Sequence, residues 1–446
     1  MNKYEPVIGL EIHVELKTKS KMFCRCSTDY FGKKPNTQTC PICLGLPGAL
    51  PYANKAAIED CIKIGLALNC TVSELSLFER KNYFYPDLPK GYQISQYRWP
   101  LCVKGWVEIK DENNNKTKIR INRVHQEEDT GKLVHLENET LVDYNRSSVP
   151  LAEIVTEPDF RSSSQVKNYS QKLQQIFRYL EVSDADMERG DMRLEANVSV
   201  RPIGQKELPN YRVELKNINS FRFITDAIEY EIKRQVDALE KGEELAQETR
   251  GWNELKSITF SQRKKEEAHD YRYFPDPDLP QIEINESEIK AIKAKMPELP
   301  DIKFERFKKE YGLSDYDTEI LTREKSMAEY FEEIIQINQE LKNRNEKFVE
   351  TKVIANWIIN KKPDINQVLP AELLKTILSA TQTVGIDEKE LEKIIKKVLD
   401  ENQKAVEDYK SGKENVIMFL IGQVMRNVKM KIDIQIVKKA LIENIK

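Results

Sequence analysis

A strict alternation of apolar and polar side chains near the N-terminus restricts residues 8–16 to a β-strand with one buried and one polar face. Carboxylates and an imidazole at every second position of a rigid strand can hold a metal ion or meet phosphate groups. The apolar positions are Ile8, Leu10, Ile12, Val14 and Leu16, and the polar positions are Gly9, Glu11, His13 and Glu15.

Residues 191–200 and 211–216 repeat this alternation, so we expect them to lie beside the first strand in one sheet. A solvated sheet face is the simpler interpretation of any one of these strands. Solvated faces favour Thr and Lys, however, whereas these strands carry Asp, Glu, Asn and His, which are poor strand formers and good metal ligands. Two carboxylates about 4 Å apart would repel by roughly 4 kcal/mol at an effective dielectric of about 20, and a divalent cation would relieve that repulsion.

Four of the seven cysteines form a Cys-x-Cys pair and a Cys-x-x-Cys pair, separated by thirteen residues of loop composition. This spacing predicts one tetrahedral zinc ion, with free thiols as the alternative, and a reducing compartment disfavours disulfides. A site with four thiolates leaves no position for a substrate, so its role would be structural. The four are Cys24, Cys26, Cys40 and Cys43; the scattered Cys61, Cys70 and Cys102 are expected to be buried or inert.

The chain of 446 residues is too long for one hydrophobic core. Up to about residue 290, strands and turns surround two helices, one after the serines at 162–164 and one from Ser220 to Gly242, which predicts an α+β domain over 1–290 with a zinc-binding loop at about 22–45. Beyond it, apolar residues recur at three- and four-residue spacing. We therefore expect a helical linker domain over 291–370 and a helical tail domain over 371–446.

Composition excludes few functions. No stretch approaches the roughly 20 apolar residues of a membrane helix, and the N-terminus shows no secretory signal, so we expect no membrane contact and a cytoplasmic location. Charged residues make up 32% of the chain but nearly cancel, at a net charge of −3. Only a local basic patch could therefore indicate a nucleic-acid partner.

Segments 80–96, 125–129, 143–155 and 263–278 hold more charged, aromatic and amide side chains than packing requires. They predict a basin of oxygen ligands with Arg and Lys at its rim, which suits a nucleoside triphosphate and its magnesium ion. The sequence contains no P-loop, dinucleotide-binding or Gly-x-Ser-x-Gly motif. Among the histidines, only His13 lies between glutamates two residues away on each side; His125, His135 and His269 are interpreted as structural.

Several long motifs, in order along the chain, resemble the B subunits of the tRNA-dependent aspartyl/glutamyl amidotransferases. Weaker likeness continues to residue 425, so the resemblance spans essentially the whole chain. The motifs are residues 80–96, Glu-Glu-Asp-x-Gly-Lys from Glu127, Glu-Ile-Val-x-Glu-Pro-Asp from Glu153, Glu-Leu-Lys-Asn-x-Asn-Ser from Glu214, Gln-Glu-Thr-Arg from Gln247, and the run from Glu266 to Asp278.

This resemblance implies an antiparallel-sheet cradle similar to the glutamine synthetase and guanidino kinase fold. It implies that ATP phosphorylates the side-chain carboxylate of Glu mischarged on glutamine tRNA, or of Asp on asparagine tRNA. Ammonia released from glutamine by an A subunit would then displace the phosphate. The implied cofactors are ATP, Mg²⁺ and structural Zn²⁺, and the implied partners are the A subunit, a C subunit and the mischarged tRNA.

The resemblance also implies roles for individual residues. Glu11, His13, Glu128 and Glu153 would hold magnesium, with Glu195 and Glu214 close by as further carboxylates toward the metal and nucleotide. Lys81 and Tyr83 would lie where the ammonia path opens, and Arg146, Arg193 and Lys216 would contact phosphates. The tail would grip the tRNA, and a solvated helix face is the alternative for its cations, which are Lys413, Arg426, Lys429, Lys431, Lys438, Lys439 and Lys446.

Three positions depart from the pattern of the family. Ser148 stands where a glycine is usual, which affects the close approach of backbone to ligand. Met430 and Ile434 stand where a glycine and a proline are expected. Two other functional classes compete with the resemblance: a stand-alone ligase that joins ammonia to a small carboxylate, and a zinc-stabilised RNA-binding protein without catalysis.

Overall fold

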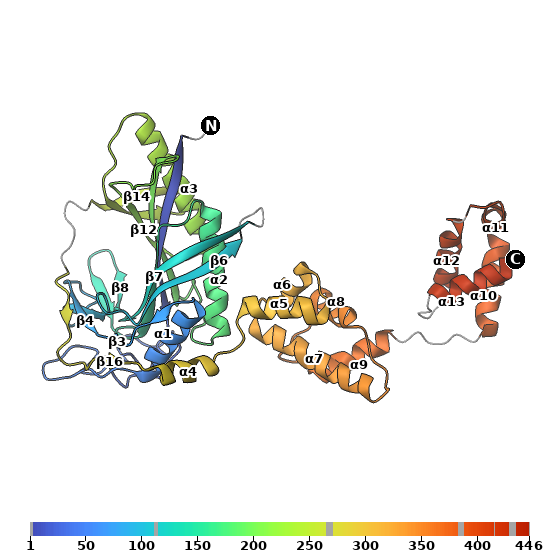
Figure 1. Ribbon diagram of the computed structural model, residues 1–446, viewed down its shortest axis with the longest axis horizontal. Coiled ribbons are helices and arrows are strands. Elements are labelled where there is room, and N and C mark those ends of the chain that lie inside the picture. Colours follow the sequence, from blue (N-terminus) through green and yellow to red (C-terminus); the bar gives the residue numbers. More distant parts are fainter. Residues whose placement is uncertain are drawn as a thin grey trace. The chain divides into compact units, whose positions relative to one another are not determined.

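The computed structural model describes residues 3–110, 115–264, 271–381, 388–413, 415–427 and 434–445 (Figure 1). The N-terminal strand lies in the middle of its largest sheet. Strand β1 (Tyr4–Glu15) confirms the predicted alternation. Its side chains at Ile8, Leu10, Ile12 and Val14 are at most 1% exposed, and the intervening positions face the opposite side.

β1 belongs to a nine-stranded sheet that is antiparallel except between β12 and β13. The predicted neighbours of β1 are present, since β11 pairs with β1 and β12 pairs with β11. The order across the sheet is β14 (Ile258–Lys264), β13 (Glu248–Asn253), β12 (Val213–Ile218), β11 (Met192–Pro202), β1, β10 (Pro150–Thr156), β7 (Lys116–Glu128), β6 (Cys102–Lys110) and β2 (Thr71–Val72).

Three helices, α1 (Lys55–Ala67), α2 (Ser163–Tyr179) and α3 (Phe221–Glu240), cover the apolar face of the sheet and share one buried core with it. α2 and α3 begin at the predicted serines, where the hydroxyls of Ser162 and Ser220 accept hydrogen bonds from backbone amides in the first turns. Each cap contributes about 1 kcal/mol to its helix. The polar face of the sheet is thereby left for other groups.

Short strands surround the ends of the sheet. β4 (Glu79–Asn82) pairs with β5 (Tyr92–Ser95) and β15 (Phe274–Pro275), and side chains of β5 reach the end of β7. The remaining pairs are β3 (Leu75–Ser76) with β16 (Ile282–Glu283), and β8 (Lys132–His135) with β9 (Thr140–Asp143). The fold class, α+β with a sheet that is mainly antiparallel, is confirmed; similarity to the glutamine synthetase and guanidino kinase cradle stays a prediction.

From Glu286 onward, every regular element in the described residues is a helix, as predicted. One compact unit ends at Glu305 and also includes Arg323–Lys325, and the second holds the remaining residues. The second unit contains two separate buried clusters, one around Phe331 and one around Leu420. Domain boundaries at 290 and 370 stay a prediction. The helices are α4 (Glu286–Ala294), α5 (Pro300–Tyr311), α6 (Asp315–Thr322), α7 (Lys325–Asn343), α8 (Thr351–Lys361), α9 (Pro370–Thr381), α10 (Glu388–Glu401), α11 (Gln403–Lys410), α12 (Val416–Asn427) and α13 (Ile434–Ile445).

The helices also bear on the question of a membrane. Among the described residues, no helix combines the length and the apolar character that crossing a bilayer requires.

Candidate active site

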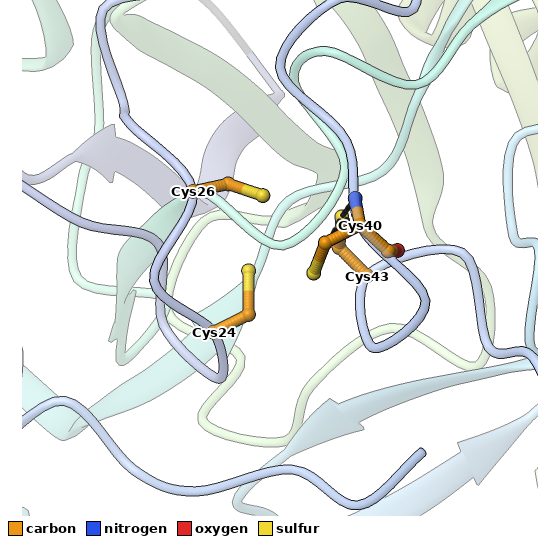
Figure 2. A group of neighbouring side chains, drawn as sticks. All are labelled: Cys24, Cys26, Cys40 and Cys43. Atoms are coloured by element: carbon orange, nitrogen blue, oxygen red, sulfur yellow. Dashed lines mark hydrogen bonds between the residues drawn. The ribbon is translucent and has the colours of Figure 1, made fainter. Parts of the chain in front are cut away.

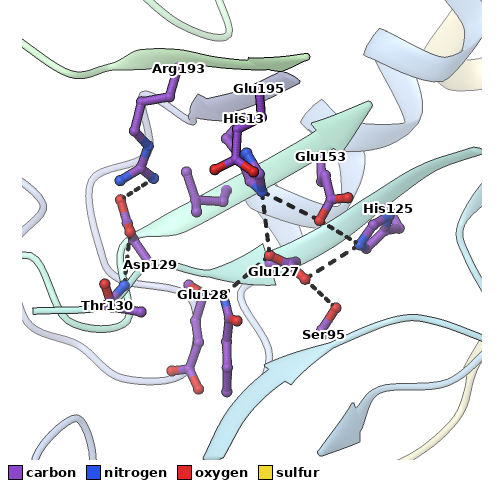
Figure 3. A network of polar contacts seen from close by, with 12 residues as sticks. His13, Ser95, His125, Glu127, Glu128, Asp129, Thr130, Glu153, Arg193 and Glu195 are labelled. Carbon is purple, nitrogen blue, oxygen red and sulfur yellow. Dashed lines mark hydrogen bonds and ion pairs between the residues drawn. The ribbon is translucent and has the colours of Figure 1, made fainter. Parts of the chain in front are cut away.

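Neighbouring strands bring ionisable side chains together on the polar face of the sheet (Figure 3). The register places His13 of β1 opposite Glu153 of β10, and Glu153 opposite His125 of β7. On the other side of β1, Glu11 lies opposite Glu195 of β11. Directly opposed residues have Cβ atoms about 5 Å apart, so strand pairing alone makes these side chains neighbours.

The first group that could hold a cation consists of His13, Glu127 and Glu153, each offering one ligand atom within 4.8 Å of the others. His13 Nε2 lies 3.4 Å from Glu153 Oε2 and 4.0 Å from Glu127 Oε2. Burial alone would lower the pKa of His13, but the hydrogen bond and charge of Glu153 outweigh it and raise the pKa to about 9. The imidazole therefore serves as a counter-ion to the two carboxylates, a role that a divalent cation could also fill.

His125 completes this network. Its Nε2 lies 3.3 Å from Glu153 Oε2 and 3.4 Å from Glu127 Oε1, so a residue interpreted as structural belongs to the charged cluster. Burial alone would lower the pKa of His125, but the charges and hydrogen bonds of Glu153 and Glu127 outweigh it and raise the pKa. Its position beside two candidate ligands makes it an orienting partner for both carboxylates.

The second group that could hold a cation consists of Glu11, Glu195 and Glu214, again within 4.8 Å of one another. Burial, followed by the charges of Glu153 and Glu195, raises the pKa of Glu11. Lys216 Nζ lies 3.0 Å from Glu195 Oε2 and 3.2 Å from Glu214 Oε1. A lysine thus offsets part of the negative charge that gathers here.

The structure places Glu127, rather than Glu128, beside His13. Glu128 Oε1 accepts a hydrogen bond of 2.9 Å from the amide of Ile94 and pairs with the ammonium of Lys90. Figure 3 shows the side chain of Glu128 directed away from His13. Glu127 instead accepts hydrogen bonds from Ser95 and Gln93 and faces the cluster. The signal for Glu127 is its spacing of two residues from His125, which puts both side chains on one strand face.

The predicted phosphate contacts are engaged with acidic groups and carbonyls. Arg193 Nη2 lies 2.7 Å from Asp129 Oδ2, and Arg146 donates to the carbonyls of Thr130 and Gly131 at 3.0 and 2.9 Å. Burial alone would raise the pKa of Asp129, but the guanidinium groups of Arg146 and Arg193 lower it to about 2. A phosphate could meet these cations only by exchanging with their present partners.

Lys81 and Tyr83 approach the same cluster from β4 and the residue that follows it. The hydroxyl of Tyr83 donates to Gln93 Oε1 at 3.1 Å, and Gln93 Nε2 donates to Glu127 Oε2 at 3.1 Å. The ammonium of Lys81 lies 5.2 Å from the ring centre of Tyr271. Burial alone would lower the pKa of Lys81, but the charge of Glu127 outweighs it and raises the pKa well above its usual value.

The four clustered cysteines converge as predicted (Figure 2), with their sulfur atoms within 4.8 Å of one another. A hydrogen bond from Cys24 lowers the pKa of Cys43 to about 5, against the effect of burial and with help from the cation of Lys21. A sulfur cluster of this kind fits a four-coordinate metal ion. Cys61, Cys70 and Cys102 are buried, and burial raises the pKa of each thiol.

Ser148 has a left-handed backbone conformation, with φ of +68°, which explains why a glycine suits this position. Its amide donates to the carbonyl of Asp129, so the turn lies against the charged network. Some residues of interest lie outside the described part of the chain: 266–270 of the motif from Glu266, Lys429, Met430, Lys431 and Lys446.

Comparison with known proteins identifies the domains of this chain and its family. The GatB/GatE catalytic domain model matches residues 6–290, and the GatB domain model matches residues 351–445. A protein of Thermodesulfovibrio yellowstonii, named as the B subunit of aspartyl/glutamyl-tRNA(Asn/Gln) amidotransferase, is 47% identical over 100% of both chains. Proteins of the same name from Caldanaerobacter subterraneus and Caldicellulosiruptor bescii are 46% and 47% identical over 99% of both chains. The chain therefore belongs to the family of amidotransferase B subunits.

Proposed function

We propose that this chain is the catalytic B subunit of a tRNA-dependent amidotransferase that converts Glu-tRNA(Gln), Asp-tRNA(Asn) or both into the corresponding amide. The observation that carries the proposal is the pair of adjoining acidic groups on one sheet face, His13–Glu127–Glu153 and Glu11–Glu195–Glu214. The names of the full-length relatives support the same reaction. The reaction joins a carboxylate to ammonia at the expense of ATP.

The first step would be phosphoryl transfer from ATP to the side-chain carboxylate of the tRNA-bound amino acid. A carboxylate oxygen forms a bond to the γ-phosphorus while the bond to the β-γ bridging oxygen breaks, which leaves ADP and an acyl phosphate. Phosphoryl transfer depends on positioning and on charge neutralisation rather than on a protein nucleophile. Arg193, Arg146 and Lys216 supply cations for phosphate oxygens once their carboxylate partners are exchanged.

The second step would be attack by ammonia on the activated carbonyl carbon, with inorganic phosphate as the leaving group and one proton lost from nitrogen. We assign delivery of ammonia to an A subunit with glutaminase activity, and we include a C subunit in the complex. Lys81 and Tyr83 would lie at the end of the route, beside Glu127. A permanent cation at Lys81 repels ammonium and so favours neutral ammonia, which is the nucleophile.

The donor sets fit the proposed metals. Carboxylate oxygens suit Mg²⁺, which accepts few protein ligands and keeps several waters, and the raised pKa of His13, at about 9, indicates a site that favours positive charge. Magnesium, when bound, would neutralise the charge of the phosphates of ATP. We propose Glu11, His13, Glu127 and Glu153 as its ligands, with Glu127 in place of Glu128. Cys24, Cys26, Cys40 and Cys43 would hold structural Zn²⁺.

We further propose that the helical tail contacts the body of the tRNA. Lys438 and Lys439 of α13 are exposed, and Arg426 lies in the last turn of α12. Lysines on an exposed helix face suit phosphates of a nucleic-acid backbone. Because the proposed substrate is an aminoacyl-tRNA, we also propose that the protein is located in the cytoplasm.

Amide formation in the reconstituted three-subunit complex tests this function. With ATP and glutamine present, we expect product from Glu-tRNA(Gln) or Asp-tRNA(Asn) and none from free glutamate. His13→Ala and Glu153→Ala should each abolish amide formation on the tRNA-bound amino acid without weakening tRNA binding. Amidation of free glutamate would instead support the small-molecule ligase, and unchanged amidation by both variants would support the RNA-binding protein and refute the assigned centre.

A further inference from the structure

Lys21 is a fully buried lysine beside the four cysteines, with 0% of the residue exposed. Its ammonium donates to the carbonyl of Gln38 at 2.8 Å and to the carbonyl of Tyr144 at 3.4 Å, and it lies 3.8 Å from Cys43 Sγ. A buried ammonium is costly unless an opposite charge accompanies it. Within the described ranges of the chain, no carboxylate forms an ion pair with Lys21, so the thiolates are its counter-charge.

The charge balance of the cysteine cluster explains why a lysine belongs there. Four thiolates around one divalent ion leave an excess of two negative charges in a buried setting. The ammonium of Lys21 removes half of that excess. Groups that touch metal ligands in this way commonly change metal affinity by about 10- to 100-fold when they are removed.

Lys21 and the cysteine loop also hold the turn formed by residues 143–148. Asn145 is fastened at both ends of its amide, since Oδ1 accepts from the amide of Gln38 at 2.7 Å and Nδ2 donates to the carbonyl of Lys34 at 2.8 Å. The hydroxyl of Ser147 donates to the carbonyl of Cys43 at 3.3 Å. The amide of Met22 donates to the carbonyl of Ser148 at 2.7 Å. The loop thus forms hydrogen bonds with residues 145, 147 and 148 along one side of the turn.

The other side of this turn faces the candidate active site. Arg146 donates to the carbonyls of Thr130 and Gly131, and its Nε lies 3.6 Å from Asp129 Oδ2. Asp129 Oδ2 in turn lies 2.7 Å from Arg193 Nη2. A continuous set of contacts therefore runs from the sulfur cluster through Lys21 and the turn to the two arginines that would meet phosphate.

We propose that Lys21 is a positioning residue with two linked functions. It neutralises the thiolate–metal centre, and it couples that centre to the 143–148 turn, so that metal binding at the cysteines fixes Arg146 in the active site. The metal then does more than stabilise a loop, because losing it would loosen a residue that contacts ATP. This inference rests on the proposed metal at the cysteines and on the proposed role of Arg146.

Lys21→Met in the full chain, within the three-subunit complex, tests the first function. Met has a similar length without the charge, and Lys34→Met, an exposed lysine of the same loop, is the matched control. Zinc affinity is measured by competition with a chromophoric chelator, without substrate. We expect Lys21→Met to weaken zinc binding about 10- to 100-fold and Lys34→Met to leave it unchanged. Equal affinities in the two variants would overturn the neutralising role.

Asn145→Ala tests the coupling independently, and it stands even if Lys21→Met does not fold. It should weaken zinc binding less than Lys21→Met does, speed amide hydrogen exchange across residues 143–149, and raise KM for ATP more than it lowers kcat. Zinc-stripped wild-type protein should show the same faster exchange. If stripping zinc leaves the exchange of 143–149 unchanged, the coupling is refuted. Because zinc affinity and exchange need no turnover, a failure of the proposed reaction itself would leave both results readable.

Discussion

Exchange of Glu127 for glutamine should separate the two adjacent glutamates by their effect on cation binding. Glu127 lies within reach of His13 and Glu153, whereas Glu128 pairs with Lys90 away from them. Removing one partner of a buried charge pair costs about 3–5 kcal/mol. Because the amide oxygen of glutamine can still coordinate a cation, we take the lower end, and about 3 kcal/mol corresponds to roughly 100-fold weaker binding.

The assay measures binding of Mn²⁺, a paramagnetic substitute for Mg²⁺, to the full-length chain. The Mg²⁺ dependence of amidation is then measured in the three-subunit complex. Glu128→Gln is the matched control because it changes the neighbouring residue in the same way. It leaves Lys90 without its carboxylate where the lysine side chain is only 10% exposed, so we expect it to lower the free energy of unfolding by about 3 kcal/mol. Its Mn²⁺ affinity should stay within a few-fold of wild type.

The opposite pattern of Mn²⁺ binding in the two variants would refute the placement of the cation beside His13. If Glu128→Gln loses Mn²⁺ binding while Glu127→Gln retains it, the cation lies at the Lys90 side of the strand and the arrangement around His13 is not the binding site. Thermal unfolding of both variants guards against a loss of binding that reflects a loss of fold.

Four further outcomes are expected. Ser148→Gly should raise the free energy of unfolding by about 1 kcal/mol, since it relieves a positive φ and the serine hydroxyl has no hydrogen-bond partner among the described residues to lose; urea denaturation measures it, and a destabilised variant would contradict it. Tyr83→Phe removes one hydrogen bond to Gln93 and should lower glutamine-dependent amidation about tenfold with ATP binding intact; equal rates would remove Tyr83 from the route. A zinc chelator should make the cysteine loop sensitive to protease; a loop that stays resistant would argue against a structural metal. The double variant Lys438→Glu and Lys439→Glu should weaken tRNA binding and flatten its salt dependence, and unchanged binding would favour a solvated helix face.

Local sequence patterns predict those elements whose position depends only on their own residues. The alternation in β1 fixes which of its faces is buried, and serine caps fix the starts of α2 and α3. The pairing of His13 with Glu153 follows less directly, because it depends on the register between β1 and β10. Register is set by packing over the whole sheet, which one strand's sequence does not contain.

A β-bulge places Glu127 on the polar face of the sheet, whereas the resemblance to the family had assigned Glu128 to the magnesium site. Ile119 and Ile121 of β7 are buried, so counting in twos from them places Glu127 on the core side and Glu128 on the polar face. The register between β7 and β10 shifts between Val155 and Thr156, which lie opposite Arg123 and Ile121, and the extra residue reverses the alternation. Val124 then becomes the buried position, and Glu127 reaches the polar face. Nothing in the residues around 122 identifies a bulge by composition.

The two proposed metal centres differ in what they would do for the fold. In the acidic groups of the sheet, each carboxylate cluster already contacts an internal cation: His13 and His125 in one, Lys216 in the other. Such a site can fold first and bind its cation afterwards, as suits an ion that arrives with ATP. In the cysteine loop, within the described residues, Lys21 is the cation in contact with a cysteine sulfur, and the loop contributes Met22 and Phe23 to the main core while residues 31–37 between the two cysteine pairs are exposed. If the proposed zinc is present, the order of the loop would depend on that ion, and the turn that carries Arg146 would depend on the order of the loop.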